Sequence, residues 1–156
     1  NRRIDIARLI ADVSDLVEID VNMGGCRLET RLDDREACVE ADPILLQQVL
    51  VNLIRNAVDA IQSQPDNEQK TISITSRLED STYVVIDVAD RGIGLSEETK
   101  HNLFKSFYTT KPEGMGIGLS ISKNIVESCN GELWYSDNPG GGAIFHVRLP
   151  RLPVGV

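Results

Sequence analysis

Apolar residues recur at helical spacing near the start of the chain, and a pair of glycines follows them. The residues that carry this pattern are Ile6, Leu9, Ile10, Val13, Leu16 and Val17. Because the spacing places these side chains on one face of a helix, it predicts a first amphipathic helix that ends before Gly24 and Gly25.

Three more helices are marked by their ends. Asp42 is a good N-cap and Pro43 suits the first helical position, which together predict a long helix over residues 43–62. Ser96 caps a predicted short helix that runs to about residue 103. A last helix is predicted over residues 120–129, ended by Asn130 and Gly131.

Alternation of apolar and polar positions predicts the strands. The strands predicted over residues 71–77 and 82–89 form a hairpin with a turn at residues 78–81. The last two predicted strands flank a glycine-rich turn at residues 138–142. The predicted strands cover residues 26–32, 38–41, 71–77, 82–89, 132–136 and 143–149.

Length and charge limit the possible functions. The 156 residues suit a single domain over residues 1–156, in which residues 1–5 are the remnant of an upstream linker and residues 151–156 a tail. Sixteen basic against twenty-four acidic residues give a net charge of −8. Because this charge repels nucleic acid and anionic membranes, we expect the domain to contact neither.

The cysteines indicate a reducing compartment. Cys26, Cys38 and Cys129 are odd in number and lack metal-ligand spacing, so we expect free thiols and a cytoplasmic location. No apolar run reaches the ~18 to 20 residues that cross a bilayer, and the start lacks the apolar segment of a signal peptide. Since the chain starts without Met, we expect a fragment of a larger protein, which can itself be membrane-anchored.

The predicted helix over residues 43–62 carries a polar stripe. At about 100° per residue, the polar side chains of this stripe fall within roughly 100° of the helix circumference, and the rest of the circumference is largely apolar. A solvated face explains such a stripe, and so does a bound ligand. Asn52 and Asn56 favour the ligand, because Asn is a poor helix former and an amide oxygen ligates Mg²⁺ without adding charge beside a triphosphate. The stripe comprises Gln48, Asn52, Arg55, Asn56, Asp59 and Ser63.

Asp90 opens an Asp-Arg-Gly-Ile-Gly segment where the second hairpin strand is predicted to end. Gly92 and Gly94 suit positions where a flat ligand approaches the backbone or where φ is positive. The Asp90 carboxylate can accept a hydrogen bond from the 6-amino group of adenine, whereas guanine offers a carbonyl oxygen, so the segment favours ATP over GTP. Taken alone, the same residues are also explained by an ordinary turn.

A second glycine cluster leads into the predicted helix over residues 120–129. Successive backbone amides at a helix start form an anion nest that suits phosphates. The dinucleotide fingerprint and the Gly-Lys-Ser/Thr phosphate loop are both absent. Thr109, Thr110 and Lys111 offer hydroxyls and a cation to terminal phosphates, with Arg55 approaching from the helix stripe; a solvated loop explains the first three residues as well. The cluster comprises Gly114, Met115, Gly116, Ile117, Gly118 and Leu119.

In this order the segments resemble the catalytic ATP-binding domain of bacterial sensor histidine kinases, within the group that includes gyrase, Hsp90 and MutL. Residues 50–60 look like the N box, 90–94 like the G1 box, 103–111 like the F box and 114–119 like the G2 box. The phrases Asn-Ala-x-Asp-Ala and Phe-x-Thr-Thr-Lys-Pro are similar to those of the oxygen, dicarboxylate and nitrogen sensors. The resemblance covers nearly all of the chain.

The resemblance implies an α/β (α+β) two-layer sandwich of the Bergerat type, with a mixed sheet backed by about three helices and an ATP lid over residues 95–117. It implies the cofactors ATP and Mg²⁺, with Asn56 as metal ligand and Asp90 on the adenine amino group. The implied catalytic residues are Asn52, Arg55, Asn56 and Lys111. The implied nucleotide-binding residues are Asn56, Asp59, Asp90, Gly92, Gly94, Thr109, Thr110, Lys111, Gly114, Met115, Gly116, Ile117, Gly118 and Leu119.

Asn52 occupies the position where the ATPase relatives carry a water-activating glutamate. An amide cannot act as a general base, which favours phosphoryl transfer to a protein over hydrolysis. The chain departs from the family pattern at Asp59, where some relatives place a lysine, and at residues 129–131, where Cys-Asn-Gly replaces the commoner His-Gly-Gly.

The resemblance also implies partners outside this sequence. A sensor kinase needs a phosphoacceptor histidine on a dimerisation helix, and we expect neither His101 nor His146 to serve. The chain is therefore predicted to bind Mg-ATP and to phosphorylate a histidine on separate dimerisation helices, which then supply a response regulator. An ATP hydrolase and a non-catalytic nucleotide-binding module remain as alternatives.

Overall fold

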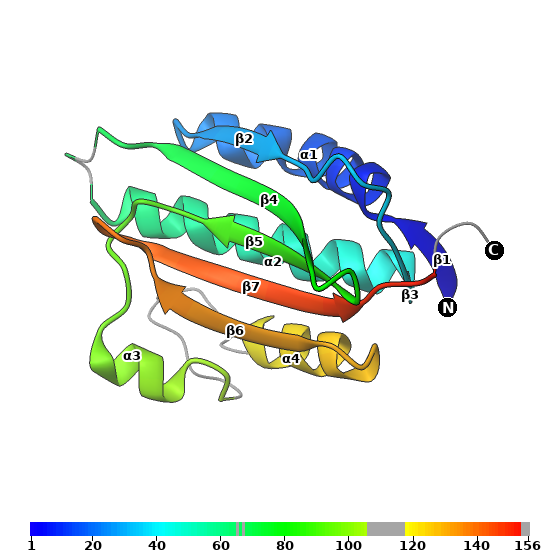
Figure 1. Cartoon of the computed structure of the whole chain (residues 1–156). Coiled ribbons are helices and arrows are strands. Elements are labelled where there is room, and N and C mark those ends of the chain that lie inside the picture. Colours follow the sequence, from blue (N-terminus) through cyan, green and yellow to red (C-terminus); the bar gives the residue numbers. More distant parts are fainter. Residues whose placement is uncertain (65, 67, 106–117, 154–156) are drawn as a thin grey trace.

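The computed structural model describes residues 1–64, 66, 68–105 and 118–153. In this part of the chain a sheet forms one layer and helices form the other (Figure 1). The elements, in chain order, are β1 (Arg2–Asp5), α1 (Ile6–Met23), β2 (Arg27–Arg31), β3 (Cys38–Ala41), α2 (Pro43–Gln62), β4 (Thr71–Glu79), β5 (Tyr83–Ala89), α3 (Glu97–Asn102), α4 (Gly118–Ser128), β6 (Glu132–Asp137) and β7 (Ala143–Pro150).

The main sheet has five strands in the order β2-β4-β5-β7-β6. It is mixed, because β2 pairs with β4 in parallel and the other pairs are antiparallel. The β4–β5 hairpin is confirmed, but its predicted turn began too early: pairing continues to Glu79 opposite Tyr83. The tight turn is made by Asp80 and Ser81, whose positive φ values of 54° and 60° match the twist of the strands.

A second, two-stranded sheet joins the two ends of the described chain. β1 pairs antiparallel with β3, with Ile4 opposite Val39. The sequence predicts a linker at residues 1–5 and no strand, because one apolar residue in four gives no alternation. After β7, the Leu152 amide donates to the Cys38 carbonyl oxygen at 2.8 Å, so the start of the predicted tail is tied to β3.

Three helices, α1, α2 and α4, cover one face of the main sheet, with α2 between the other two (Figure 1). The predicted bounds of α2 are confirmed, and the Asp42 carboxylate caps it by accepting from the Ile44 amide at 2.9 Å. Ser96 caps α3 as predicted, by accepting from the Thr99 amide at 3.1 Å.

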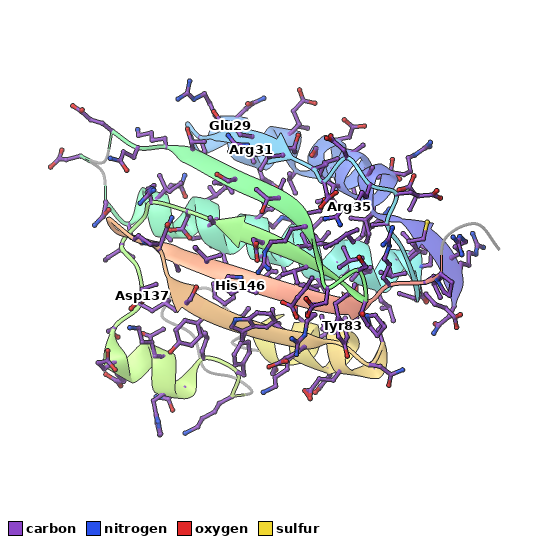
Figure 2. The ribbon with its side chains drawn as sticks, in the orientation of Figure 1. Glu29, Arg31, Arg35, Tyr83, Asp137 and His146 are labelled. Carbon is purple, nitrogen blue, oxygen red and sulfur yellow. The ribbon has the colours of Figure 1, made fainter. Side chains whose placement is uncertain are left out.

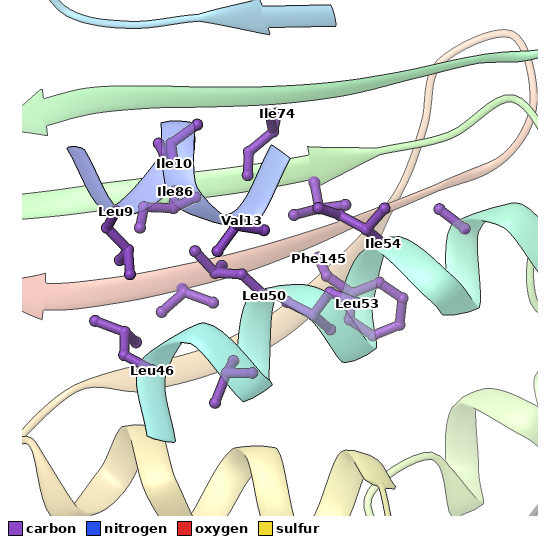
Figure 3. Packing of buried hydrophobic residues seen from close by; sticks show 14 of the residues in the cluster. Leu9, Ile10, Val13, Leu46, Leu50, Leu53, Ile54, Ile74, Ile86 and Phe145 are labelled. Carbon is purple, nitrogen blue, oxygen red and sulfur yellow. The ribbon is translucent and has the colours of Figure 1, made fainter. Parts of the chain in front are cut away.

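The core lies between the helices and the sheet, and α2 contributes more of its large, fully buried side chains than any other described element (Figure 3). Leu46, Leu50, Leu53 and Ile54 have no exposed surface. Among the described helices α2 is also the one long and apolar enough to span a membrane by length and composition. Eight of its residues are buried in this core, which accounts for its apolar character.

The opposite face of the sheet carries a polar network around His146 (Figure 2). The His146 ring lies 2.5 Å from the Asp87 carboxylate and 2.7 Å from the Ser136 hydroxyl, and Trp134 stacks on it. Burial by itself would raise the pKa of Asp87, but hydrogen bonds from His146 and Arg77 outweigh burial and lower it. His146 is thus engaged within the sheet, at the strand position that the alternation predicts.

Candidate functional site

The segment that follows β5 is pressed against the backbone of α2. A Cβ atom on Gly92 would lie 2.6 Å from the Ala60 carbonyl carbon, so a larger residue does not fit without movement of the helix. The Ile93 amide donates to the Ala60 carbonyl oxygen at 3.2 Å. Because Ala60 is one helical turn beyond Asn56, this packing holds the Asp90 segment beside the polar stripe of α2.

Asp90 is buried at the end of β5, with 4% of its surface exposed. Its amide donates to the Ala143 carbonyl oxygen at 3.0 Å, and its carboxylate accepts from the Gly92 amide at 2.8 Å. Burial raises the pKa of Asp90, and hydrogen bonds of its carboxylate with the backbones of Gly92 and Ala143 oppose the shift. Each carboxylate oxygen can accept more than one hydrogen bond, so Asp90 retains acceptor capacity for the amino group of a base.

The turn between β6 and β7 supports the Asp90 backbone. The Asn138 side-chain amide donates to the Asp90 carbonyl oxygen at 2.7 Å. Gly142 has a φ of 100°, and a Cβ atom there would overlap the same carbonyl group. The sequence predicts this turn but not its contact with Asp90, since strand order is needed to bring the two together.

About two helical turns before Ala60 on α2, the carboxamide of Asn52 faces the first turn of α4. A Cβ atom on Gly118 would lie 3.0 Å from both Nδ2 and Oδ1 of Asn52. Asn52 Nδ2 donates to the Ser122 hydroxyl at 3.4 Å, and Ser122 is buried. The sequence analysis missed Ser122, because a serine one turn after Gly118 is not distinctive until α4 is packed against α2.

Arg55 is turned towards α1. Its guanidinium pairs with the Asp20 carboxylate at 2.9 Å, and 59% of its side chain is exposed. The contribution of Arg55 to a phosphate site stays a prediction, and it requires this ion pair to open. Together with Asn52, Arg55 borders a groove of about 370 Å³ between α1 and α2, lined by Leu16, Ile44, Gln47, Gln48, Val51, Asn52 and Arg55.

The described start of the predicted lid is anchored to the rest of the domain. Lys100 on α3 pairs with Asp137 at the end of β6, at 3.0 Å. Phe104 packs against the core, and the Lys123 ammonium lies 5.0 Å from the centre of its ring. These contacts fix the start of the segment against β6 and α4.

The remaining predicted site residues divide into two groups. Asn56 and Asp59 are half-buried on α2, Leu119 packs partly buried against the core, and Gly94 has the positive φ expected of it, at 75°. The predicted residues outside the described part of the chain are Thr109, Thr110, Lys111, Gly114, Met115, Gly116 and Ile117.

The donor set fits a magnesium nucleotide. Asn52 and Asn56 supply amide oxygens one turn apart on α2, and Asp90 supplies a buried acceptor beside the same helix. Mg²⁺ takes oxygen ligands and keeps several waters, so a site with few protein ligands suffices. Within residues 1–64, 66, 68–105 and 118–153, no group of three or more His, Cys, Asp or Glu residues forms a separate metal site.

Comparison with known proteins assigns the family. A profile described as histidine kinase-, DNA gyrase B-, and HSP90-like ATPase matches residues 41–153. The chain belongs to this ATPase family. Sensor protein FixL of Bradyrhizobium diazoefficiens is 37% identical over 93% of this chain, and the C4-dicarboxylate transport sensor protein DctS of Rhodobacter capsulatus is 38% identical over 94%. The chain spans 28% and 22% of these two relatives.

Solved structures of the family agree with the fold. The catalytic domain of histidine kinase ThkA is 30% identical, with a TM-score of 0.82 over 97% of this chain and 98% of that one. The mycobacterial sensor histidine kinase MprB, at 21% identity, has the same fold with a TM-score of 0.82. The predicted two-layer sandwich and the resemblance to the ATP-binding domain of two-component sensor histidine kinases are thereby confirmed.

Proposed function

We propose that this chain is the catalytic domain of a two-component sensor kinase, which binds Mg-ATP and donates the γ-phosphoryl group to a histidine on a separate dimerisation helix. The observation that carries the proposal is the clamp between Gly92 and Ala60, which holds a buried carboxylate beside the two asparagines of α2. In this arrangement the Asp90 carboxylate can accept a hydrogen bond from the base of a nucleotide, and the amide oxygens of α2 can bind the cation at its phosphates.

Each group then has a distinct task. Asp90 accepts from the adenine 6-amino group, and guanine is disfavoured because its carbonyl oxygen would face the carboxylate. Asn56 holds Mg²⁺, which when bound neutralises charge on the phosphate oxygens. The glycine cluster before α4, together with Thr109, Thr110 and Lys111, is proposed to bind the phosphates.

Transfer is favoured over hydrolysis by the chemistry of Asn52. A hydrolase needs a base to activate water, and a carboxamide has no basic site at neutral pH. The side chain of Asn52 is engaged with Ser122 and Gly118, which suits a positioning role. Hydrolysis of the gyrase or Hsp90 type is therefore the weaker alternative.

The acceptor histidine is proposed to come from outside this chain. His146 is engaged by Asp87 and Ser136 on the far face of the sheet, with 12% of its side chain exposed. Because a paired imidazole on the far face of the sheet cannot reach a phosphate on the helical side, His146 should not be phosphorylated in the chain alone. The full kinase would pass the phosphoryl group to a response regulator in the cytoplasm.

Complementation tests the proposal. The chain is mixed with separately expressed dimerisation helices of its parent kinase and with radiolabelled Mg-ATP. We expect acid-labile phosphohistidine on the helices, none on the chain alone, and a large loss with Asn56→Asp. Steady phosphate release without helices would indicate a hydrolase, and nucleotide binding without transfer would indicate a non-catalytic module.

A further inference from the structure

Two polar side chains are buried in the part of the chain that the structure describes, and both lie at the candidate site. They are Asp90, at 4% exposure, and Ser122, at 3%. A buried polar group carries a desolvation cost, so its presence calls for a partner or a task. The proposed adenine contact gives Asp90 a task, whereas Ser122 lies on α4, outside every motif that the sequence suggested.

Ser122 and Gly118 both lie next to the side-chain carboxamide of Asn52. They are four residues apart, so they share a face of α4. The Ser122 hydroxyl accepts from Asn52 Nδ2 at 3.4 Å, and the Cα of Gly118 lies where any side chain would meet the Asn52 amide at 3.0 Å. A carboxamide held at both places has a restricted rotation, because the Gly118 backbone lies close to it while the Ser122 hydroxyl holds one end of it by a hydrogen bond.

We propose that Ser122 is a positioning residue, which fixes the Asn52 carboxamide and so couples the start of α4 to the cation-binding face of α2. The inference rests on the proposed nucleotide binding and deepens it. Asn52 is one turn from Asn56 on α2, and Gly118 is the last glycine of the cluster assigned to phosphates. The Asn52–Ser122 hydrogen bond thus links α2, which is proposed to hold the cation, to α4, which follows the glycine cluster proposed to bind the phosphates.

The coupling should appear in the cation-dependent part of nucleotide affinity. Adenine recognition at Asp90 does not involve α4, so loss of the Ser122 hydroxyl should lower affinity for ADP in EDTA much less than affinity for Mg-ADP. With Mg²⁺, Ser122→Ala should weaken ADP binding by about three- to tenfold, as expected for one hydrogen bond. Isothermal titration calorimetry with ADP, with and without Mg²⁺, measures both quantities.

Matched variants separate positioning from packing. Ser122→Cys keeps the size of the side chain and weakens the hydrogen bond, so it should reproduce the loss even if Ser122→Ala unfolds. Ser128→Ala makes the same change on the same helix, at a hydroxyl that bonds the Ile125 carbonyl oxygen, and should change neither affinity. In a double-mutant cycle, Asn52→Ala and Ser122→Ala should be non-additive.

A second readout does not depend on nucleotide. In NMR spectra of the free chain, the side-chain Nδ2 hydrogens of Asn52 should exchange faster in Ser122→Cys than in Ser128→Ala. Equal loss of affinity with and without Mg²⁺, additive effects of Asn52→Ala and Ser122→Ala, or unchanged exchange would each overturn the proposal. If the unaltered chain fails to bind ADP at all, the proposed function fails, which is a distinguishable result.

Discussion

The backbone of Gly92 packs on the carbonyl group of Ala60 so closely that no Cβ atom fits between them. Gly92→Ala should therefore push the Asp90 segment away from α2. We expect the free energy of unfolding to fall by about 1–3 kcal/mol, the range for overpacking. Affinity for ADP should fall as well. Urea unfolding and calorimetry check both effects, and an unchanged free energy of unfolding would show that the close packing is not a constraint.

Gly94 serves as the matched control for this substitution. Its φ is 75°, and a Cβ atom there would come no closer than 3.6 Å to its nearest neighbour. The cost of Gly94→Ala should arise from backbone conformation alone, and Gly94→Asn should cost less because Asn tolerates a positive φ. At Gly92, Asn should cost more than Ala, because the larger Asn side chain meets the same Ala60 carbonyl group.

Asp90→Asn should separate stability from binding. Burial raises the pKa of Asp90, which means that the ionised carboxylate is disfavoured in the folded chain. Asn removes that charge and keeps the shape, so the free energy of unfolding at pH 7 should stay the same or rise while ADP affinity falls by about tenfold or more. A variant that loses stability and keeps affinity would contradict the assignment of Asp90 to the base.

The pH dependence of stability should differ between Asp90 and Asp87. Because the folded chain raises the pKa of Asp90, protonated Asp90 adds to the free energy of unfolding. This stabilisation is fully present below pH 3.8, the ordinary pKa, and is lost as pH rises through the folded pKa. The lowered pKa of Asp87 gives stability that is present above 3.8 and is lost as pH falls through its folded pKa. Urea unfolding from pH 3 to pH 7, roughly the range of carboxylate titration, measures both effects. In Asp87→Asn the free energy of unfolding should fall less towards low pH than in the unaltered chain. In Asp90→Asn it should fall less as the pH rises.

The Arg55–Asp20 ion pair offers a test of whether Arg55 acts on phosphate. Exposed pairs contribute about 0–1 kcal/mol, so Arg55→Ala and Asp20→Ala should each change stability little. If Arg55 leaves Asp20 for the nucleotide, Arg55→Ala should reduce transfer to the dimerisation helices, and Asp20→Ala should maintain or increase it. Equal effects of the two variants would restrict Arg55 to a structural role.

The sequence was most informative where local chemistry decides the structure. The bounds of α2 follow from the Asp42 cap, Pro43 and a continuous apolar face, and all three are visible in the residues. Strand β1 was missed because Arg2–Asp5 has no alternation, and its partner strand β3 is more than thirty residues away. Such a strand exists because of pairing, which no local pattern records.

The same division applies to the candidate site. Asn52 and Asn56 could be selected from residue chemistry because Asn is a poor helix former, and Asp90 could be selected from the two glycines that follow it. Ser122 could not, because a serine on a helix is unremarkable until α4 is packed against α2. The direction of Arg55 also depends on packing, since α1 supplies the carboxylate that turns it away.

Calorimetry with Mg-ADP and Mg-GDP tests the central claim most directly, because it asks whether the chain binds a nucleotide and whether it selects adenine. The account predicts saturable binding of one Mg-ADP per chain, with Mg-GDP weaker by about tenfold or more. No binding of Mg-ADP at millimolar concentration, or equal affinity for the two nucleotides, would contradict it.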